Sequence, residues 1–266
     1  MRRTLPLVAG LAALALTACG SSSGATTTSG SPASSSSRSS SAATGAITVF
    51  AASSLKESFS AIGAAFEAAN PGTKVTFNFG ASSTLATQIT QKAPADVFAS
   101  ASQKTMDTVT SAGAATGDTV FAVNTMEIAT PAMPTVPVTS LADLAKPGVK
   151  VVICQKDVPC GAAAQKLFTQ NNLTVTPVSQ EVDVKAVLSK VVLGEADAGI
   201  VYVTDVKAAG AKVAGVVIPK DQNVTTTYPI APIASSTNAV TAKAFVDFVL
   251  SPAGQTVLAA AGFTSP

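Results

Sequence analysis

A strand, a turn of small residues and a helix follow one another early in the chain, and this unit constrains the fold more than any other feature. Residues 47–50 are mostly apolar and β-branched, as in a buried strand. Apolar side chains recur at helical spacing over residues 55–69, and Asn70-Pro71-Gly72 ends that helix. The first backbone N–H groups of such a helix have no internal partner and attract an anion. Ser54 or Ser53 adds a hydroxyl donor for this anion, or one of them only caps the helix.

The same alternation of strand and helix continues along the chain. Residues 74–79 alternate as a strand, Gly80-Ala81-Ser82-Ser83 forms a second turn with two serines, and residues 84–91 follow as a helix. Further strand patterns, each followed by a helical pattern, occur at residues 95–99, 150–154 and 198–202. This order predicts an α/β protein with a largely parallel sheet.

The N-terminus has the pattern of an export signal. Two arginines precede an apolar run over residues 5–18, which is shorter than the roughly 20 residues that a membrane-spanning helix needs. The run ends in Leu16-Thr17-Ala18-Cys19-Gly20, which resembles the lipobox of bacterial lipoproteins. That resemblance implies a signal peptide over residues 1–18 and acylation of Cys19. The alternative is an ordinary signal peptide with an incidental cysteine.

The segment after this signal is rich in Ser, Thr, Gly and Ala and carries one charge, Arg38. It lacks the apolar side chains that a core needs. We therefore predict a flexible tether over residues 19–45, which holds a soluble body outside the cytoplasm and anchors it to the membrane through Cys19.

Composition excludes several functions. The chain has no histidine, which removes Ser-His-Asp and Cys-His catalysis and the commonest transition-metal ligand. Without Arg2 and Arg3, its 17 Lys and Arg residues fall to 15, equal to the 15 Asp and Glu residues. A neutral body without basic clusters lacks the electrostatic pattern of a nucleic-acid-binding protein. We therefore predict neither an enzyme nor a nucleic-acid partner, and no cofactor.

Two cysteines remain in the predicted body, Cys154 and Cys160. An even pair in an exported protein favours a disulfide, and two free thiols are the alternative. The loop Asp157-Val158-Pro159-Cys160-Gly161-Ala162 then begins another helix. Its N–H groups face outward from a helix start, or the loop is only tied by the disulfide.

Two further segments complete the candidate site. Asp183 is predicted to cap the helix that begins near Val184. Tyr202 ends a buried strand pattern, at the strand end where open α/β sheets bind ligands, although it also fits the edge of a core. The helix starts near Ser54, Ser82, Cys160 and Val184 offer N–H and O–H donors and little charge. Such a set suits a small, fully ionised oxyanion in a cleft between two lobes.

Several segments resemble one known family, the molybdate-binding proteins of ABC transporters. These segments are residues 47–55, 82–89, 93–101, 158–161 (Val-Pro-Cys-Gly), 199–202 (Gly-Ile-Val-Tyr) and 261–264 (Ala-Gly-Phe-Thr). The resemblance covers nearly all of the chain after the tether. It implies a two-lobed type II periplasmic-binding-protein fold, each lobe a mixed, largely parallel sheet flanked by helices, with two crossovers. It also implies lobe 1 at residues 46–125 and 228–266, and lobe 2 at residues 126–227. In the sequence, strand patterns at residues 120–123 and 126–130 precede a segment with three prolines at residues 131–137. This segment and the polar run at residues 221–227 are the candidate crossovers.

The resemblance also implies a ligand set. Hydroxyls come from Ser54 and Ser82, backbone N–H groups from Ser54, Ser82, Cys160 and Val184, and a phenol from Tyr202. Ser53 and Ser83 are further candidate contacts. Molybdenum is bound only as the oxyanion, without direct bonds from the protein to the metal.

The expected function is capture of molybdate, with tungstate as a second ligand, and delivery to an ABC permease by a monomeric lipoprotein at the outer face of the cell membrane. The alternatives are a receptor for another small oxyanion such as sulfate, and a structural surface lipoprotein. An enzyme is excluded mainly by the absence of histidine.

Overall fold

The structure is a computed structural model that describes residues 43–266. The predicted signal peptide, Cys19 and most of the predicted tether lie outside these residues. The described body begins slightly earlier than predicted, because the Thr44 N–H donates to Thr241 Oγ1 at 3.1 Å and the Gly45 N–H donates to the Gly72 carbonyl at 2.9 Å. Thr44 and Gly45 are therefore part of the body and not of a free tether.

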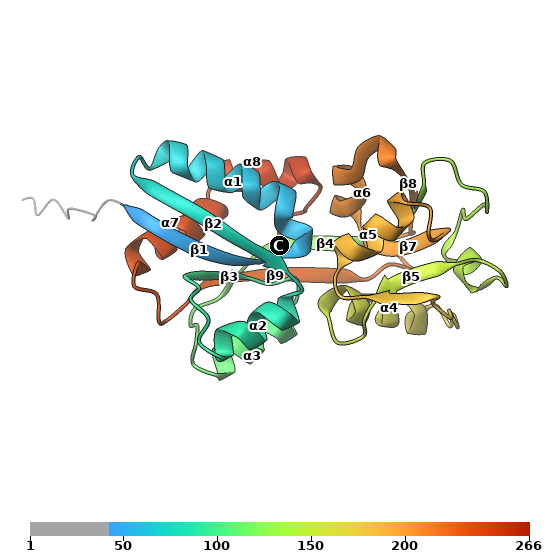
Figure 1. Ribbon diagram of the computed structural model, residues 1–266, viewed down its shortest axis with the longest axis horizontal. Helices are drawn as coiled ribbons and strands as arrows, with labels where there is room; N and C mark the ends of the chain where they lie inside the picture. The colour runs from blue at the N-terminus through green and yellow to red at the C-terminus, as the bar shows by residue number, and fades with distance from the viewer. Residues whose placement is uncertain (1–42) are drawn as a thin grey trace, which may run out of the picture. The chain divides into compact units, whose positions relative to one another are not determined.

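One half of the sheet combines strands from the first half of the chain with one strand from near its end (Figure 1). In spatial order its strands are β2 (Thr73–Gly80), β1 (Gly45–Ala52), β3 (Val97–Ala99), β9 (Thr225–Pro232) and the first part of β4 (Thr119–Pro131). β1 runs parallel to β2 and β3, whereas β9 is antiparallel to both of its neighbours. This half of the sheet is therefore mixed, as predicted.

Helices cover both faces of this half. α1 (Lys56–Ala69), α7 (Ala239–Leu250) and α8 (Pro252–Ala261) pack on one face, and α2 (Ser82–Thr90) and α3 (Gln103–Ser111) contribute to a separate apolar cluster. Phe59 lies at the centre of the first cluster, with its ring centroid 5.6 Å from Phe121 and 6.1 Å from Phe245. Apolar burial of this kind supplies most of the stabilisation of the half.

The other half of the sheet has its own cluster of buried apolar side chains. Its strands are β8 (Val213–Val217), the last part of β4, β7 (Ala198–Tyr202), β5 (Val151–Cys154) and β6 (Ser179–Glu181). Its helices are α4 (Pro159–Gln170), α5 (Val184–Val192) and α6 (Val203–Ala209). Short 3-10 helices are η1 (Ser53–Leu55), η2 (Leu141–Ala145) and η3 (Gly210–Lys212). The continuous apolar runs of β5 and β7 are fully buried, as is typical of parallel strands covered by helices.

β4 joins the two halves as a single strand. Its residues 119–125 pair with β9, and its residues 126–131 pair with β7 and β8. The sequence predicted two separate strands here and placed a crossover at residues 131–137. That position is wrong, because Pro131 still pairs with Val213 inside the second half. The passage between halves occurs instead within β4, where extended backbone continues without a break.

The chain returns to the first half near Asn223. Its side chain accepts from the Met126 N–H at 3.1 Å and donates to the Met126 carbonyl at 2.8 Å. Residues 225–227 then pair with β4 in the first half. This return lies within the polar run 221–227 that the sequence singled out. The division into lobes at residues 125/126 and 227/228 stays a prediction.

Within residues 43–266, no single helix has the length and apolar composition to cross a membrane. Only α7 and α8 taken together, with a bend of 59° between them, reach that length and composition.

Candidate functional site

Six chain segments meet around one small cavity at the junction of the two halves. They are the β1–η1 turn, the β2–α2 turn, the loop after β3, the start of α4, the start of α5 and the end of β7. The lining residues are Ala52, Ser53, Ser54, Gly80, Ala81, Ser82, Ala101, Val158, Pro159, Cys160, Asp183, Val184 and Tyr202. The structure therefore brings together all five residues of the predicted ligand set.

Three of the helices that begin at this cavity lack a side-chain cap. The residues in the N-cap position are Ala52 for η1, Ala81 for α2 and Val158 for α4, and none of them makes a side-chain cap hydrogen bond. Two helices that begin elsewhere do have such a cap, since Ser102 accepts from Thr105 at α3 and Ser251 accepts from Gly254 at α8, whereas α7 begins at Asn238 without one. The first N–H groups of η1, α2 and α4 thus remain available to a ligand.

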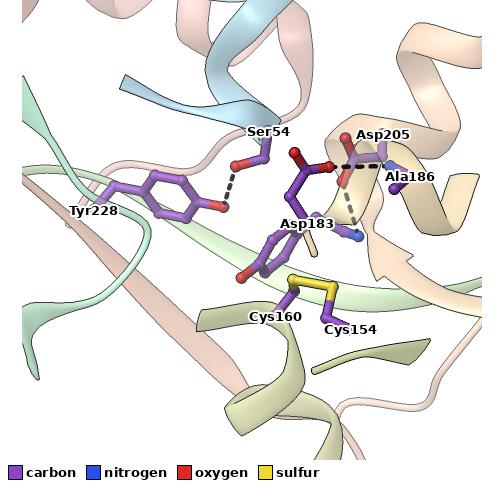
Figure 2. Close-up of a disulfide and its surroundings, with 8 residues drawn as sticks. Ser54, Cys154, Cys160, Asp183, Ala186, Asp205 and Tyr228 are labelled. Carbon is purple, nitrogen blue, oxygen red and sulfur yellow. Dashed lines mark hydrogen bonds between the residues drawn. A yellow bond between two sulfur atoms is a disulfide. The ribbon is translucent and has the colours of Figure 1, made fainter. Parts of the chain in front are cut away.

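Ser54 is not a helix cap, so the capping alternative from the sequence is wrong for this residue. Its Oγ shares a hydrogen bond of 3.0 Å with the Oη of Tyr228 on β9 (Figure 2). Ser54 is 4% exposed and Tyr228 is fully buried. The hydroxyl of Ser54 therefore lies at the cavity with a buried phenol behind it.

Ser82 has a comparable partner behind it. The backbone N–H of Ala101 donates to Ser82 Oγ at 3.0 Å. Because a backbone N–H can only donate, this bond occupies a lone pair of the serine and leaves its proton free. Ser82 can therefore donate its O–H into the cavity while its oxygen stays bonded to the protein.

Tyr202 places an unpaired phenol at the cavity. Its side chain is 1% exposed, and its Oη has no hydrogen-bond partner among the described residues. Burial raises the pKa of Tyr202 well above its ordinary value, and the neighbouring Tyr228 and Asp205 add to this shift. The phenol consequently stays protonated and can donate. A buried donor without a partner costs free energy, which a ligand oxygen at this position would recover.

A buried carboxylate fixes the backbone of Tyr202. The Tyr202 N–H donates to Asp205 Oδ2 at 3.2 Å, and Asp205 Oδ1 lies 3.0 Å from Lys185 Nζ. Lys185 directly follows Val184, so an ion pair between the partly exposed Lys185 and the buried Asp205 holds the end of β7 against the start of α5. Lys185 also reaches Glu57 on α1 at 2.8 Å, which links the two halves of the molecule beside the cavity.

Asp183 caps α5 as predicted, but it also lines the cavity. Its Oδ1 accepts from the Ala186 N–H at 3.0 Å (Figure 2). Among residues 43–266, no basic side chain lines the cavity. An anion there would therefore be stabilised by N–H and O–H dipoles, with one carboxylate in the wall.

The start of α4 is held tightly against the end of β5. A disulfide joins Cys154 to Cys160, in agreement with the preferred sequence interpretation (Figure 2). Gly161 allows the closest approach, because a Cβ at this position would collide with the carbonyl oxygen of Gln155 and lie 2.8 Å from that of Cys154. Disulfide and glycine together position the N–H groups at the start of α4.

Breaking this disulfide is expected to lower the free energy of unfolding by about 2 kcal/mol, because so short a loop constrains the unfolded chain only moderately. Urea unfolding with and without reductant measures the difference, and the Cys154→Ala/Cys160→Ala variant serves as the control that cannot be reduced. An unchanged midpoint in a sample whose two thiols have become reactive would contradict this expectation.

The two further candidate contacts from the sequence, Ser53 and Ser83, have different positions in the structure. Ser53 lines the cavity, whereas Ser83 does not, and the Ser83 carbonyl accepts from Thr87 within α2. Successive helical residues are rotated by about 100°, so Ser82 and Ser83 cannot both face the same point. Sequence reasoning missed Tyr228 and the N–H of Ala101. No local pattern marks either of them, since their partners are 174 and 19 residues away in the chain.

The cavity is small, with a volume of about 10 Å³, room for about one water-sized group. A tetrahedral oxyanion enters only if the six segments separate slightly, as a hinge motion permits. Within residues 43–266 no cluster of three or more Cys, Asp or Glu side chains could hold a metal ion. The lining offers mainly N–H and O–H donors, a set that suits a compact anion.

Comparison with known proteins agrees with this chemistry. Residues 47–264 match the family described as bacterial extracellular solute-binding proteins. The molybdate-binding protein ModA of Mycobacterium tuberculosis is 42% identical over 261 residues, which cover 98% of this chain and 97% of that protein. The family and this relative are binding proteins by name, which confirms the prediction that the chain is not an enzyme.

Solved structures confirm the fold. The periplasmic molybdate-binding protein of Azotobacter vinelandii superimposes with a TM-score of 0.74 at 21% identity, over 83% of this chain and 99% of that one. The sulfate-binding protein SubI of Mycobacterium tuberculosis superimposes with a TM-score of 0.73 at 21% identity, over 83% of this chain and 86% of that one. At this identity the likeness concerns the fold alone, and the predicted type II periplasmic-binding-protein fold is confirmed.

Proposed function

Because this chain belongs to the family of bacterial extracellular solute-binding proteins, we propose that it captures molybdate in the cavity between its two halves. The observation that carries the proposal is the convergence of uncapped helix starts with the hydroxyls of Ser54, Ser82 and Tyr202. Such a set binds an oxyanion without a proton, because each of its oxygens can accept several hydrogen bonds. The similarity to ModA of Mycobacterium tuberculosis supports molybdate as that oxyanion.

The cavity is far smaller than the 300–1,000 Å³ typical of sites for drug-sized ligands, so a small inorganic ion requires less opening than an organic ligand would. Selectivity against sulfate would then depend mainly on the distance between opposing donors, since both ions are tetrahedral dianions. Tungstate has the same charge and shape as molybdate, and we propose it as a second ligand.

A protonated oxyanion such as phosphate is the second candidate, and Asp183 is the reason. Hydrogen phosphate needs an acceptor, and the Asp183 carboxylate lines the cavity. One of its oxygens already accepts from Ala186. Sulfate is a further candidate, since the sulfate-binding SubI shares the fold.

Thermal unfolding with molybdate, tungstate, sulfate and phosphate in turn tests these candidates. A ligand that binds only the folded state adds about 2.7 kcal/mol at 100 times its dissociation constant. The proposal expects a rise in Tm with molybdate and tungstate. A rise only with phosphate or sulfate would keep the oxyanion site and replace its ligand. No rise with any of the four ions would contradict an oxyanion receptor.

Removing one donor at a time tests the site itself. Ser82→Ala and Tyr202→Phe are each expected to weaken molybdate binding by about 1–3 kcal/mol, because an oxygen of the bound ion loses a charge-assisted hydrogen bond. Calorimetric titration measures the change. Ser83→Ala is the matched control, since Ser83 neighbours Ser82 but does not line the cavity, and its affinity should equal that of the unaltered protein. Unchanged affinity in both site variants would remove these hydroxyls from the site.

We also propose a setting for the protein, in which a monomer delivers its ion to an ABC permease and stays at the outer face of the membrane through acylated Cys19. The arginines, the apolar run and the small residues before Cys19 support the anchor. Labelling of cells with a radioactive fatty acid tests it, since Cys19→Ala should abolish the label and release the protein.

A further inference from the structure

Tyr228 stands behind a residue of the site without reaching the cavity itself. It lies on β9 and is fully buried, and its Oη is 3.0 Å from Ser54 Oγ (Figure 2). Its ring centroid lies 5.1 Å from that of Phe263 and 6.0 Å from that of Tyr202. These aromatic contacts hold the phenol in place, so its hydroxyl meets Ser54 at a fixed position.

The direction of this hydrogen bond determines what Ser54 offers to a ligand. A serine hydroxyl has one proton to donate and two lone pairs that accept. If Ser54 donated to Tyr228, only its lone pairs would face the cavity, and these repel an anion. If Tyr228 donates, one lone pair of Ser54 is occupied and its proton is free for the ion.

Two features fit donation by Tyr228. Burial raises the pKa of Tyr228, so the phenol has a proton to donate. Ser82, a second serine of the site, is held in this arrangement by the Ala101 N–H, which can only donate. With an anion present, both serines would be held as donors by a group that lies behind them.

We propose that Tyr228 is a positioning residue that holds the Ser54 hydroxyl as a donor and so makes the site favour oxyanions without a proton. In this role Tyr228 acts through Ser54 and does not itself line the cavity. The inference rests on the proposed oxyanion function and assigns to Tyr228 the discrimination between molybdate or sulfate, which carry no proton, and hydrogen phosphate, which carries one.

A double-mutant cycle separates this role from general packing. Tyr228→Phe is expected to weaken molybdate binding about tenfold, the size of one lost hydrogen bond. Because Tyr228 acts through Ser54, the double variant Ser54→Ala/Tyr228→Phe should bind no more weakly than Ser54→Ala alone. Additive losses, or no loss in Tyr228→Phe, would overturn the proposal.

Competition supplies a readout that packing alone would not move. In Tyr228→Phe the free lone pair of Ser54 can accept a hydrogen bond from the O–H group of hydrogen phosphate. The measured quantity is how strongly phosphate displaces bound molybdate at mildly alkaline pH, divided by how strongly sulfate does. This ratio should be higher for Tyr228→Phe than for the unaltered protein. An unchanged ratio of phosphate to sulfate competition would contradict the proposed role.

Ser58→Ala is the matched control for this experiment. Ser58 is a buried serine on α1 that donates to the Leu55 carbonyl and does not line the cavity. The affinity of Ser58→Ala for molybdate and its ratio of phosphate to sulfate competition should equal those of the unaltered protein. If the unaltered protein fails to bind molybdate, the proposed function fails; if it binds and the cycle is additive, only the role of Tyr228 fails.

Discussion

Replacing Lys185 by methionine is expected to lower the free energy of unfolding by about 3–5 kcal/mol at neutral pH, because it leaves a buried carboxylate without its counter-charge. Asp205 is fully buried, with Lys185 Nζ 3.0 Å from its Oδ1. Burial alone would lower the pKa of Lys185, but Asp205 and Glu57 more than offset it and raise the pKa. Chemical unfolding monitored by circular dichroism measures the loss.

The pH dependence identifies the cause. Burial raises the pKa of Asp205, and Lys185 opposes this shift. Without Lys185 the folded state binds a proton at Asp205 more readily than the unfolded state does. The stability deficit should therefore be smallest below the ordinary pKa of an aspartate and grow as the pH rises through the folded pKa.

Two further variants serve as controls for Lys185→Met. Glu57→Gln removes only the half-exposed partner of Lys185, so its stability should change by less than about 1 kcal/mol. Lys185→Met/Asp205→Asn removes both buried charges and should recover much of the loss. Equal losses in Glu57→Gln and Lys185→Met would contradict the central role of the buried pair.

Replacing Gly161 by alanine is expected to destabilise the protein by about 3 kcal/mol and to weaken oxyanion binding, because its Cβ would collide with backbone atoms. The collision involves the Gln155 carbonyl oxygen, and the Cys154 carbonyl oxygen lies 2.8 Å away. The disulfide between Cys154 and Cys160 limits how far this backbone can move. The start of α4 must therefore shift, and its N–H groups shift with it.

Thermal unfolding and calorimetric titration of Gly161→Ala measure the two effects. Ala162→Ser is the control, because residue 162 is exposed and follows Gly161 on the same helix turn. Its stability and affinity should stay close to those of the unaltered protein. If Gly161→Ala bound molybdate as tightly as the unaltered protein, the start of α4 would not contribute to the site.

The helix starts of the site were predictable from the sequence because the signals are local. Strand, small residues and helix follow one another within about ten residues at Ser54 and Ser82, and the same order recurs at Cys160. Each such turn lies at the carboxyl end of a strand, where open α/β sheets bind ligands. Asp183 was likewise predictable as a cap from its place before an apolar helix.

The groups behind the site were not predictable because their contacts join distant segments. Glu57 and Lys185 are 128 residues apart, and each resembles an ordinary charge on a helix surface. The position of the crossover was also missed. Prolines at 131–137 resembled a connection between lobes, whereas β4 carries extended backbone from one half to the other without any change in composition.

Equilibrium dialysis of the purified protein against molybdate shows whether the cavity binds this ion. We expect saturable binding of one ion per chain, displaced by tungstate and resistant to an equal concentration of sulfate or phosphate, and weakened in Tyr202→Phe. Absence of saturable binding, or equal displacement by all three ions, would contradict the assignment of the cavity to molybdate.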